Sequence, residues 1–562
     1  MNRIDRPPHP GRGGQARNTP KGRVADAQSQ AEIDALLDER PRRPDLLIEY
    51  LHLVQDHYGQ ISARHLTALA EALRLSLVEA YETATFYAHF DVVKEDEAPI
   101  PALTIRVCES LSCALAGSHD LLAQLEKAAD KNIRIQPVPC IGQCACAPAA
   151  VVGQNVIAPA KIQTVMAAAQ AQQTTSKETC ETSFDAYRAQ GGYALYEKVR
   201  DSGQEADALL ELLDQAGLRG MGGAGFPVAR KWRAVRGMNG RKAMIVNADE
   251  GEPGTFKDHY LLEKDPHRIL EGALIAAHIV GADEIYFYLR DEYAGLRQTL
   301  AREIAKLPGG WTPIHLRRGA GSYVCGEESA LIESLEGKRG YPRQRPPLPF
   351  QSGLFGRPTL TNNVETLYFV RLIAEKGAGW WREQGCNGAT GLRHYSVSGR
   401  VKNPGVKCAP AGLTLAQLLN DYCGGMAEGH ELAAYLPGGA SGGILPATLA
   451  DVPLDFGTLE QYGCFIGSAA IIILSDKDDL KEAARNLMAF FADESCGQCT
   501  PCRLGTAKSL QLMQNDTWDL SLLDDLADVM RDSSICGLGQ AAPNPVQSLI
   551  QHFPHLFAEL RR

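Results

Sequence analysis

Fifteen cysteines, eight of them in two tight groups, constrain this 562-residue chain more than any other feature. The odd count and the uneven spacing make a secreted disulfide framework improbable. Cysteines grouped in this way usually hold metal in a reducing compartment. The remaining scattered thiols are expected to be small buried or half-exposed residues, and they include Cys180, Cys386, Cys408, Cys423 and Cys464.

The C-terminal group has three cysteines at two-residue spacing, Cys496, Cys499 and Cys502, and a remote fourth, Cys536. Three thiolates at this spacing wrap one face of a cubane while the fourth returns from afar, which is typical of a [4Fe–4S] cluster. Structural zinc is the alternative. Its cysteine ligands typically come as two separated pairs, so the cluster is favoured.

The N-terminal group consists of the pairs Cys108–Cys113 and Cys140–Cys144. Each pair follows a predicted strand, so both pairs are expected at one edge of a small domain. Two pairs can each hold one iron of a [2Fe–2S] cluster. A zinc site remains an alternative here, because this cysteine spacing hardly distinguishes zinc from a [2Fe–2S] cluster. Cys146 is a further thiol nearby.

The length predicts three or more domains. Patterning predicts a mixed α/β and α+β chain with a thioredoxin-like domain, a nucleotide-holding α/β domain and a β-grasp-like domain. Strands are expected near 103–107, 133–138, 150–152, 243–246, 285–289, 395–401 and 464–474. The predicted segments are a disordered or partner-docking tail (1–30), a helical segment (31–98), the thioredoxin-like domain (99–170), a linker (171–189), the α/β domain (190–394), the β-grasp-like domain (395–474) and a helical domain with the second cysteine group (475–562).

A glycine-rich loop follows a predicted helix at 206–215, and it contains Gly220, Gly222, Gly223 and Gly225. The motif G-x-G-x-x-G alone is weak, and a Rossmann fingerprint requires a strand before it. Glycines still permit close approach of backbone to a phosphate or a ring, and Lys231 could neutralise a phosphate. A purely structural turn is the alternative.

Two acidic loops sharpen this interpretation. Burying so many carboxylates at strand ends is unfavourable unless a ligand or water satisfies them. Ribityl and ribose hydroxyls would donate hydrogen bonds to such carboxylates. The alternative is that both loops are simply acidic and exposed to solvent. The residues are Asn247, Asp249, Glu250 and Glu252 in the first loop and Tyr323, Gly326, Glu327 and Glu328 in the second.

Composition excludes several classes of protein. A net charge of −10 and a pI near 5.8 argue against a general nucleic-acid binder. No apolar run reaches 18 residues, so no membrane span is expected. The basic N-terminus lacks an apolar stretch and is not typical of a secretory signal. A cytoplasmic protein is expected.

Taken together, the motifs resemble a known family. Residues 190–562 resemble the flavin-bearing, NADH-oxidising subunit of respiratory complex I, and residues 36–170 resemble its thioredoxin-like [2Fe–2S] partner. The second likeness rests on the segment 82–90 and on Cys140-Ile-Gly-Gln-Cys144-x3-Pro148. Such fusions occur in diaphorase subunits of soluble NAD-dependent formate dehydrogenases and of NAD-linked hydrogenases. The stretches 400–407 and 435–445 look most like the formate dehydrogenase beta subunit.

The resemblance implies FMN held by the glycine loop, Lys231, Asn247, Asp249 and the loop 326–328. NAD(H) would stack beside Phe226, with Glu252 and Glu328 lining its place. Glu327 and Glu328, the candidate catalytic residues, would set position and electrostatics rather than abstract protons. Three positions depart from the complex I pattern at the adenine contacts. The remaining family positions are Glu250, Tyr323, Asn362 and Asn363, and the departures are Ala234, Arg345 and Leu348.

The resemblance also implies the path of electron transfer. Hydride would pass between NAD(H) and FMN, and single electrons between FMN and the [4Fe–4S] cluster, with the [2Fe–2S] cluster on the other side as a branch or store. The implied partner is a large subunit with a molybdenum or tungsten pterin cofactor and further iron–sulfur clusters, which oxidises formate reversibly to CO2. Alternatives are a hydrogenase diaphorase, a fused complex I module, or an iron–sulfur scaffold without a nucleotide site.

Overall fold

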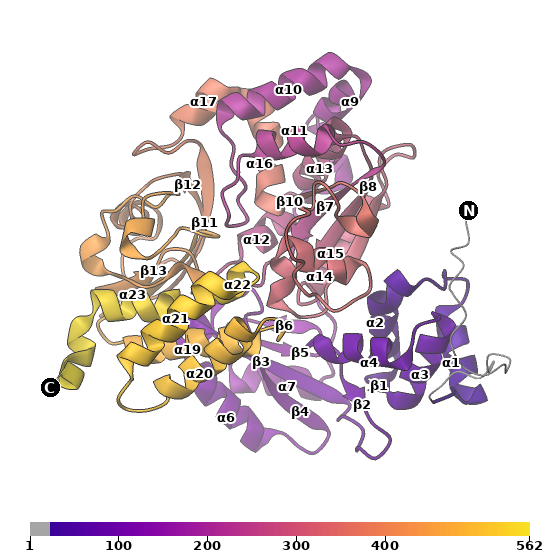
Figure 1. The fold of residues 1–562 in the computed structure, drawn as a ribbon, viewed down its shortest axis with the longest axis horizontal. Helices are drawn as coiled ribbons and strands as arrows, with labels where there is room; N and C mark the ends of the chain where they lie inside the picture. The colour runs from indigo at the N-terminus through magenta and orange to yellow at the C-terminus, as the bar shows by residue number, and fades with distance from the viewer. Residues whose placement is uncertain (1–22, 562) are drawn as a thin grey trace, which may run out of the picture.

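The computed structural model describes residues 23–561, and Figure 1 shows their arrangement. Four helices form the N-terminal part, as predicted. The Asp26 side chain caps the first of them, so this helix starts inside the segment predicted as a tail; residues 1–22 of that tail lie outside the described residues. The elements are α1 (Ala27–Leu37), α2 (Leu47–Tyr58), α3 (Ala63–Ala72), α4 (Leu77–Phe86) and the short parallel strands β1 (Ile61–Ser62) and β2 (Val92–Val93).

The next part is a four-stranded sheet in the order β4-β3-β5-β6, which confirms the thioredoxin-like expectation. β3 pairs with β4 in parallel and with β5 antiparallel, and α6 and α7 pack against this sheet. The predicted strands are present almost to the residue. The elements are β3 (Leu103–Cys108), α5 (Leu111–Leu115), α6 (Ser118–Ala128), β4 (Ile133–Val138), β5 (Ala150–Val152), β6 (Asn155–Ile157) and α7 (Ile162–Gln170).

A four-stranded, all-parallel sheet in the order β10-β7-β8-β9 forms the centre of the molecule. Its central strands are apolar and buried, as expected when helices cover a parallel sheet. The strands are β7 (Lys242–Ala248), β8 (Ala282–Leu289), β9 (Ile314–Arg318) and β10 (Thr359–Asn363). The helices are α8 (Phe184–Ala189), α9 (Ala194–Asp201), α10 (Gly203–Ala216), α11 (Val228–Arg236), α12 (Lys257–Lys264), α13 (Pro266–Val280), α14 (Ala294–Ile304), α15 (Glu328–Leu335), α16 (Val364–Lys376) and α17 (Ala378–Glu383).

The predicted linker is only partly a linker. Its last six residues form α8, and Tyr187 of this helix is buried, with its hydroxyl donating to Glu271 of α13. The end of the segment therefore belongs to the core around the parallel sheet. An aromatic residue in a polar stretch was the signal for this.

A mixed five-stranded sheet follows, in the order β12-β11-β15-β13-β14. It begins at Leu392, three residues before the predicted domain start, and the predicted strand over 464–474 is shorter because Gly463, Gly467 and Ala469 take positive φ angles before it. The elements are β11 (Leu392–Gly399), β12 (Gly405–Pro410), α18 (Leu415–Gln417), β13 (Leu432–Leu436), η6 (Ala440–Gly442), β14 (Leu445–Pro446) and β15 (Ala470–Ser475).

The C-terminal part is helical, as predicted, and its yellow ribbon in Figure 1 lies between the orange mixed sheet and the purple thioredoxin-like sheet. α19 contacts α5, and α23 contacts β14, so these helices join the two regions. The division of the chain into seven segments stays a prediction. The helices are α19 (Leu480–Asp493), α20 (Thr500–Met513), α21 (Leu520–Ser533), α22 (Gly537–Ala541), α23 (Asn544–His552) and the 3-10 segment η9 (Pro554–Arg561).

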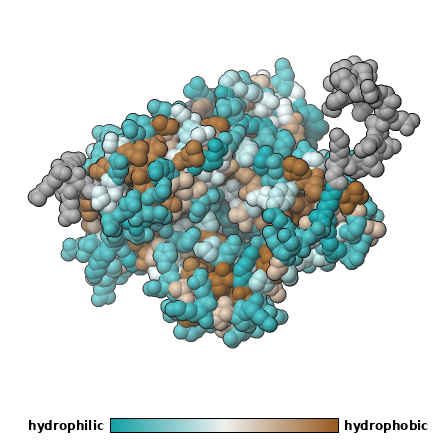
Figure 2. Space-filling view, turned by 60° about the horizontal axis from the view of Figure 1, so that its bottom comes forward, coloured by the Kyte–Doolittle hydropathy of each residue, from teal (hydrophilic) through white to brown (hydrophobic). Residues whose placement is uncertain are grey.

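Within residues 23–561, every helix is too short or too polar to span a membrane. Figure 2 shows a face on which hydrophobic residues form separate patches divided by hydrophilic ones.

Candidate cofactor sites

Two adjoining cavities, of about 650 and 430 Å³, open at the carboxyl ends of β7 and β10. Asn247 at the end of β7 is the register partner of Asn363 at the end of β10, and both line both cavities. The carboxyl ends of parallel strands are where ligands bind in open α/β sheets. The sheet topology therefore creates one large site from segments more than a hundred residues apart.

Every residue that the sequence pointed to as cofactor-binding lines one of these cavities. Their roles in binding stay predictions, but their convergence is a property of the fold. The first cavity is lined by Gly222, Gly223, Asn247, Asp249, Glu250, Glu252, Tyr323, Gly326, Glu327 and Asn363. The second is lined by Gly220, Gly222, Gly225, Phe226, Lys231, Asn247, Gly326, Glu327, Glu328, Arg345, Asn362 and Asn363.

The glycine-rich loop fits its place only without side chains at two positions. A Cβ added to Gly222 would lie 3.1 Å from the Cβ of Asn363, and one added to Gly225 would lie 2.7 Å from the ring of Phe456. Gly225 also has a φ of +63°, which L side chains rarely adopt. The loop therefore brings backbone, rather than side chains, to the cavity wall.

Asp249 offers the clearest test of fit for a hydroxyl-rich ligand. Its Oδ2 is buried and has no hydrogen-bond partner, although the residue lines the first cavity. Burial raises the pKa of this carboxyl well above its ordinary range, which hydroxyl donors from a ligand would counteract. A ribityl or ribose chain supplies such donors, so the site fits the FMN that the resemblance implies.

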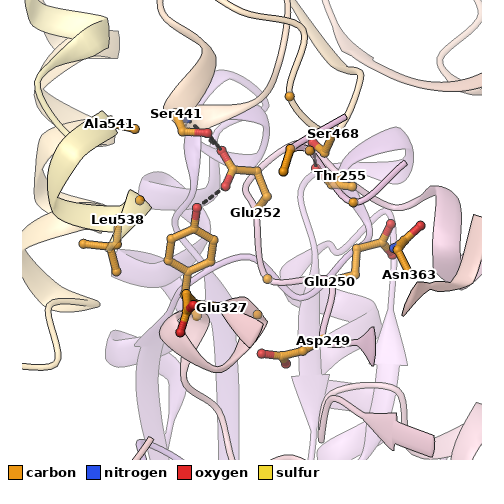
Figure 3. A pocket seen from close by; sticks show the side chains of 18 of the residues that line it. Asp249, Glu250, Glu252, Thr255, Glu327, Asn363, Ser441, Ser468, Leu538 and Ala541 are labelled. Carbon is orange, nitrogen blue, oxygen red and sulfur yellow. Dashed lines mark hydrogen bonds between the residues drawn. The ribbon is translucent and has the colours of Figure 1, made fainter. Parts of the chain in front are cut away.

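Glu252 is held by two other parts of the chain, as Figure 3 shows. Its Oε2 accepts from the Tyr323 hydroxyl, and its Oε1 accepts from the amide and hydroxyl of Ser441 at 2.7 and 2.8 Å. Burial raises the pKa of both Glu252 and Tyr323, so the tyrosine stays a neutral donor. These contacts fix the carboxylate at the cavity wall.

Sequence reasoning missed the part of the wall that comes from the mixed sheet and the C-terminal helices. The one available signal was the glycine cluster at 438–443, which brings η6 close to Glu252: a Cβ on Gly439 would lie 2.7 Å from the Glu252 Cγ. The missed lining residues include Ser441, Phe465, Gly467, Ser468, Arg531, Gly537, Leu538, Gln540 and Asn544.

Four of the five charged residues that line the second cavity form two ion pairs. Lys231 Nζ lies 2.7 Å from Glu328 Oε2, and Arg345 pairs with Glu327. Glu327 also caps α15, because its Oε2 accepts from the amides of Ser329 and Ala330 at 2.9 Å. Both glutamates are thus engaged as acceptors, which agrees with a positioning and electrostatic role.

The predicted nicotinamide side of the site presents an open aromatic ring. Phe226 is 47% exposed and lines the second cavity, with the Arg230 guanidinium 5.6 Å from its ring centre. Of the three positions that depart from the complex I pattern, Ala234 and Leu348 line neither cavity, whereas Arg345 lines the second. Neither Ala234 nor Leu348 is aromatic, so the rings expected at these two positions for an adenine contact are absent.

The N-terminal cysteine group comes together as two touching pairs. Cys108 ends β3, Cys113 lies in α5, and both Cys140 and Cys144 follow β4. All four are buried. The Cys140 and Cys144 Sγ atoms are 3.3 Å apart, and the Cys108 thiol contacts both Cys113 and Cys140. Two pairs side by side suit the two irons of a [2Fe–2S] cluster.

The C-terminal group gathers at the amino ends of two helices. Cys499 is the N-cap of α20, Cys502 lies in its first turn, and Cys536 is the N-cap of α22. The amides of Leu538 and Gly539 donate to the Cys536 sulfur. Burial raises the pKa of Cys502 to about 11 and that of Cys536 to about 12, so a bound metal must favour the thiolates.

The sulfur spacing separates clusters from zinc. A tetrahedral zinc with Zn–S near 2.3 Å holds its thiolates about 3.8 Å apart. In the described part of the chain, only His52, His89 and Asp291 place three candidate ligand atoms within 4.8 Å of one another. Neither cysteine group does so, and both therefore fit iron–sulfur clusters better than zinc.

The three sites are close neighbours. Cys536 itself lines the second cavity. On the other side, Arg290 donates from Nη2 to the Cys140 carbonyl and from Nη1 to the carbonyl of Glu250, which lines the first cavity. The cavities are thus bordered by one cysteine group and tied through a single arginine to the other.

Three family models match the chain in this order. A thioredoxin-like [2Fe–2S] ferredoxin model matches residues 33–172, the Nuo51 FMN-binding domain matches 213–372, and the NADH-ubiquinone oxidoreductase-F iron–sulfur binding region matches 482–560. Each matched region contains the residues that the sequence assigned to that cofactor. The sequence expectation of both clusters and of FMN is confirmed.

Curated relatives and solved structures agree with these matches. An F-type subunit of the NADH-quinone oxidoreductase of Rhizobium meliloti is 38% identical over 386 residues, which are 65% of this chain and 91% of that protein. The corresponding F-type subunit of Aquifex aeolicus is 38% identical over 398 residues, 68% of this chain and 92% of that protein. A crystal structure of an NAD+-reducing [NiFe]-hydrogenase in the air-oxidised state covers 93% of this chain and 95% of its own, with 32% identity and a TM-score of 0.82.

Proposed function

The chain belongs to the family of F-type subunits of NADH-quinone oxidoreductase, and we propose that it is the diaphorase subunit of an NAD-dependent formate dehydrogenase. It is an NADH:FMN oxidoreductase module with FMN, one [4Fe–4S] cluster and one [2Fe–2S] cluster. The observation that carries the electron-transfer role is that Cys536 lines the same cavity as the flavin-site residues Lys231 and Gly222. Chemistry in the cavity would thus occur beside a cluster ligand.

FMN, when bound, supplies the exchange between two-electron hydride chemistry and one-electron cluster chemistry. The protein's residues position the reactants. Asp249 accepts from ligand hydroxyls, Lys231 offers positive charge, and Phe226 gives an open surface for a stacked ring. Glu252, fixed by Tyr323 and Ser441, holds its carboxylate at the wall without giving up its hydrogen bonds.

The proposed partner is a large catalytic subunit that holds a molybdenum or tungsten pterin cofactor and further iron–sulfur clusters. It would exchange electrons with the group held by Cys496, Cys499, Cys502 and Cys536 while it oxidises formate to CO2. Support comes from the fused layout and from the stretches 400–407 and 435–445. The grouped, unpaired thiols suit a reducing compartment, so we place the complex in the cytoplasm.

A hydrogenase partner is the second candidate. The structure of an NAD+-reducing hydrogenase covers 93% of this chain, including the fused thioredoxin-like part. A fused complex I module is a third possibility within the same family. The candidates differ in the chain that delivers electrons, not in the diaphorase chemistry.

The decisive experiment is purification of the native complex under anaerobic conditions. We expect a large subunit with molybdenum or tungsten, and NAD+ reduction with formate but not with H2. A nickel-containing partner and H2-dependent NAD+ reduction would replace the formate proposal by the hydrogenase one. NADH-dependent dye reduction by this chain alone tests the diaphorase role separately.

A further inference from the structure

A buried lysine contacts the middle of the glycine-rich loop. Lys257 is 2% exposed, and its Nζ donates to the main-chain oxygen of Met221 at 2.7 Å. Met221 lies between Gly220 and Gly222, and its amide donates to the Thr366 hydroxyl at 2.9 Å. Both Lys257 and Met221 line the first cavity. Side chains of α12 and α16 therefore bind both main-chain polar groups of Met221.

Lys257 occupies an unfavourable position for a cation. It is the first residue of α12, where the helix dipole disfavours positive charge, and its side chain is removed from water. Glu365 offsets part of this cost, since its Oε2 accepts from Lys257 Nζ at 2.6 Å. Residues that break local rules in this way are expected at functional or strained sites. The position of Lys257 therefore points to a role in the cavity that it lines.

The carboxylate that binds Lys257 is itself fixed from its other side. Glu365 is fully buried, and its Oε1 accepts from the amide of His394 at 2.7 Å and from the ring Nδ1 at 3.0 Å. The Phe369 ring stacks on this imidazole at 5.2 Å. Burial opposes protonation of the ring, but contacts with the Cys408 thiol and with Glu365 raise the pKa of His394 to about 9. Glu365 thus presents a fixed Oε2 to Lys257.

The glycine-rich loop has few contacts of its own that would fix its conformation. Gly223 and Gly225 have φ angles of +120° and +63°, and glycine loses more conformational freedom on ordering than other residues. In the described part of the chain, side chains hydrogen-bond to the backbone of residues 220–225 at Met221 alone. A loop that is ordered before its ligand arrives lowers the cost of binding.

We propose that Lys257 is a positioning residue of the flavin site, which holds the glycine-rich loop, through the Met221 oxygen, in the conformation that receives FMN. The inference rests on the proposed binding of FMN in the two cavities. Lys257 acts through the loop and not on the reacting atoms, so its loss should lower the affinity for FMN. The alternative is that the Lys257–Glu365 pair only stabilises the fold.

The first test measures FMN binding to the full-length chain, prepared anaerobically with its clusters and then freed of flavin. Flavin fluorescence during titration with FMN gives the dissociation constant, which should rise at least tenfold in Lys257→Met. Lys264→Met removes a 42% exposed lysine at the other end of α12 and should bind FMN like the unmodified protein. Absence of FMN binding to the unmodified chain would overturn the flavin site itself. Equal affinity of Lys257→Met and the unmodified chain would overturn only the role of Lys257.

Hydrogen exchange of the flavin-free protein separates loop order from global stability. In Lys257→Met, the amides of residues 220–225 should exchange at least tenfold faster, whereas those of residues 243–248 in β7 should keep their rate. Unchanged exchange in the loop would overturn the proposal. An equal acceleration in both segments would do so too, because it would show a loss of stability alone.

A double variant keeps the test valid if Lys257→Met folds poorly. Lys257→Met leaves Glu365 as an unpaired buried charge, which is destabilising. Adding Glu365→Gln removes this charge and keeps an acceptor for His394. The affinity of the double variant for FMN should still be at least tenfold weaker than that of the unmodified chain, because the Met221 oxygen lacks its donor. Full recovery of the affinity would assign the pair a purely structural role and refute the proposal.

Discussion

Arg290 donates a hydrogen bond of 2.7 Å from Nη2 to the main-chain oxygen of Cys140. Its Nη1 donates to the Glu250 carbonyl, and its guanidinium pairs with Glu292 at 2.6 Å. The side chain is only 5% exposed. One buried cation thus joins the loop of the N-terminal cysteine group to the wall of the first cavity.

Replacing this cation should weaken both the fold and the cluster site. Arg290→Met leaves Glu292 and two buried carbonyls without their donor, which should cost about 3 kcal/mol of stability. Thermal unfolding and the EPR signal of the [2Fe–2S] cluster would measure the two effects. Arg241→Met removes an arginine whose side chain is 70% exposed and should change stability by less than about 0.5 kcal/mol. Equal melting temperatures of the two variants would contradict the claim that Arg290 links the cysteine loop to the cavity wall.

Lys231→Ala should release the flavin and leave the clusters in place. Without the Lys231 ammonium, Glu328 keeps an unpaired negative charge in the cavity that we propose to hold the FMN phosphate. Flavin fluorescence after denaturation and iron content per chain measure the two outcomes. Lys198→Ala, at an exposed ion pair on α9, is the control. Full flavin retention in Lys231→Ala would count against the loop assignment.

Cys499→Ser should separate the two halves of the electron path. NADH-dependent dye reduction should stay near the unmodified rate, because no flavin-site residue is changed. Coupled turnover with the partner subunit should fall at least tenfold, because Cys499, the N-cap residue of α20, is one of the four proposed ligands of the cluster that passes electrons to the partner. Cys180→Ser replaces a half-exposed thiol outside both groups and should leave both activities intact. Unchanged coupled turnover in Cys499→Ser would refute the proposal that electrons reach the partner through the cluster of the C-terminal cysteine group.

Residues close together in sequence were predictable, and the partners that the fold brings to them were not. The cysteine spacings predicted two metal-binding groups, and the glycine-rich loop and the acidic loops pointed to residues that line the two cavities. Ser441 binds Glu252 across 189 positions, and no local pattern reveals such a contact. Cys408 was misjudged for a related reason: it is exposed, not buried or half-exposed as predicted, because β12 lies at the sheet edge, which strand order alone decides.

The Glu365–His394 pair should shape stability at both ends of the pH range. Burial opposes ionisation of Glu365, but Lys257 and His394 lower its pKa to about 2, so its contribution is complete above its ordinary value of 4.5 and is lost as the pH falls toward 2. The pKa of His394 is raised to about 9, so its contribution is complete below 6.5 and is lost as the pH rises through 9.

Each shift of this size corresponds to about 3 kcal/mol, and because the two groups share one ion pair the contributions are not additive. His394→Gln should therefore flatten the fall in melting temperature between pH 6.5 and 9. The same slope in the variant and the unmodified protein would rule out this role of the pair.

Ala234→Phe should tighten NADH binding. Ala234 follows Lys231 by three positions on α11, so the two lie on the same face of the helix, and Lys231 lines the second cavity. A ring at this position restores the aromatic surface that the complex I pattern has there. A stacked aromatic pair contributes about 1 kcal/mol, which corresponds to roughly a fivefold lower KM for NADH.

The kcat with a dye acceptor should not change, because the adenine half lies away from the reacting ring. Ala194→Phe, at the start of α9, adds the same ring on another helix, at an exposed position that lines neither cavity, and should leave KM unchanged. An unaltered KM in Ala234→Phe would mean that the adenine half binds elsewhere in this chain.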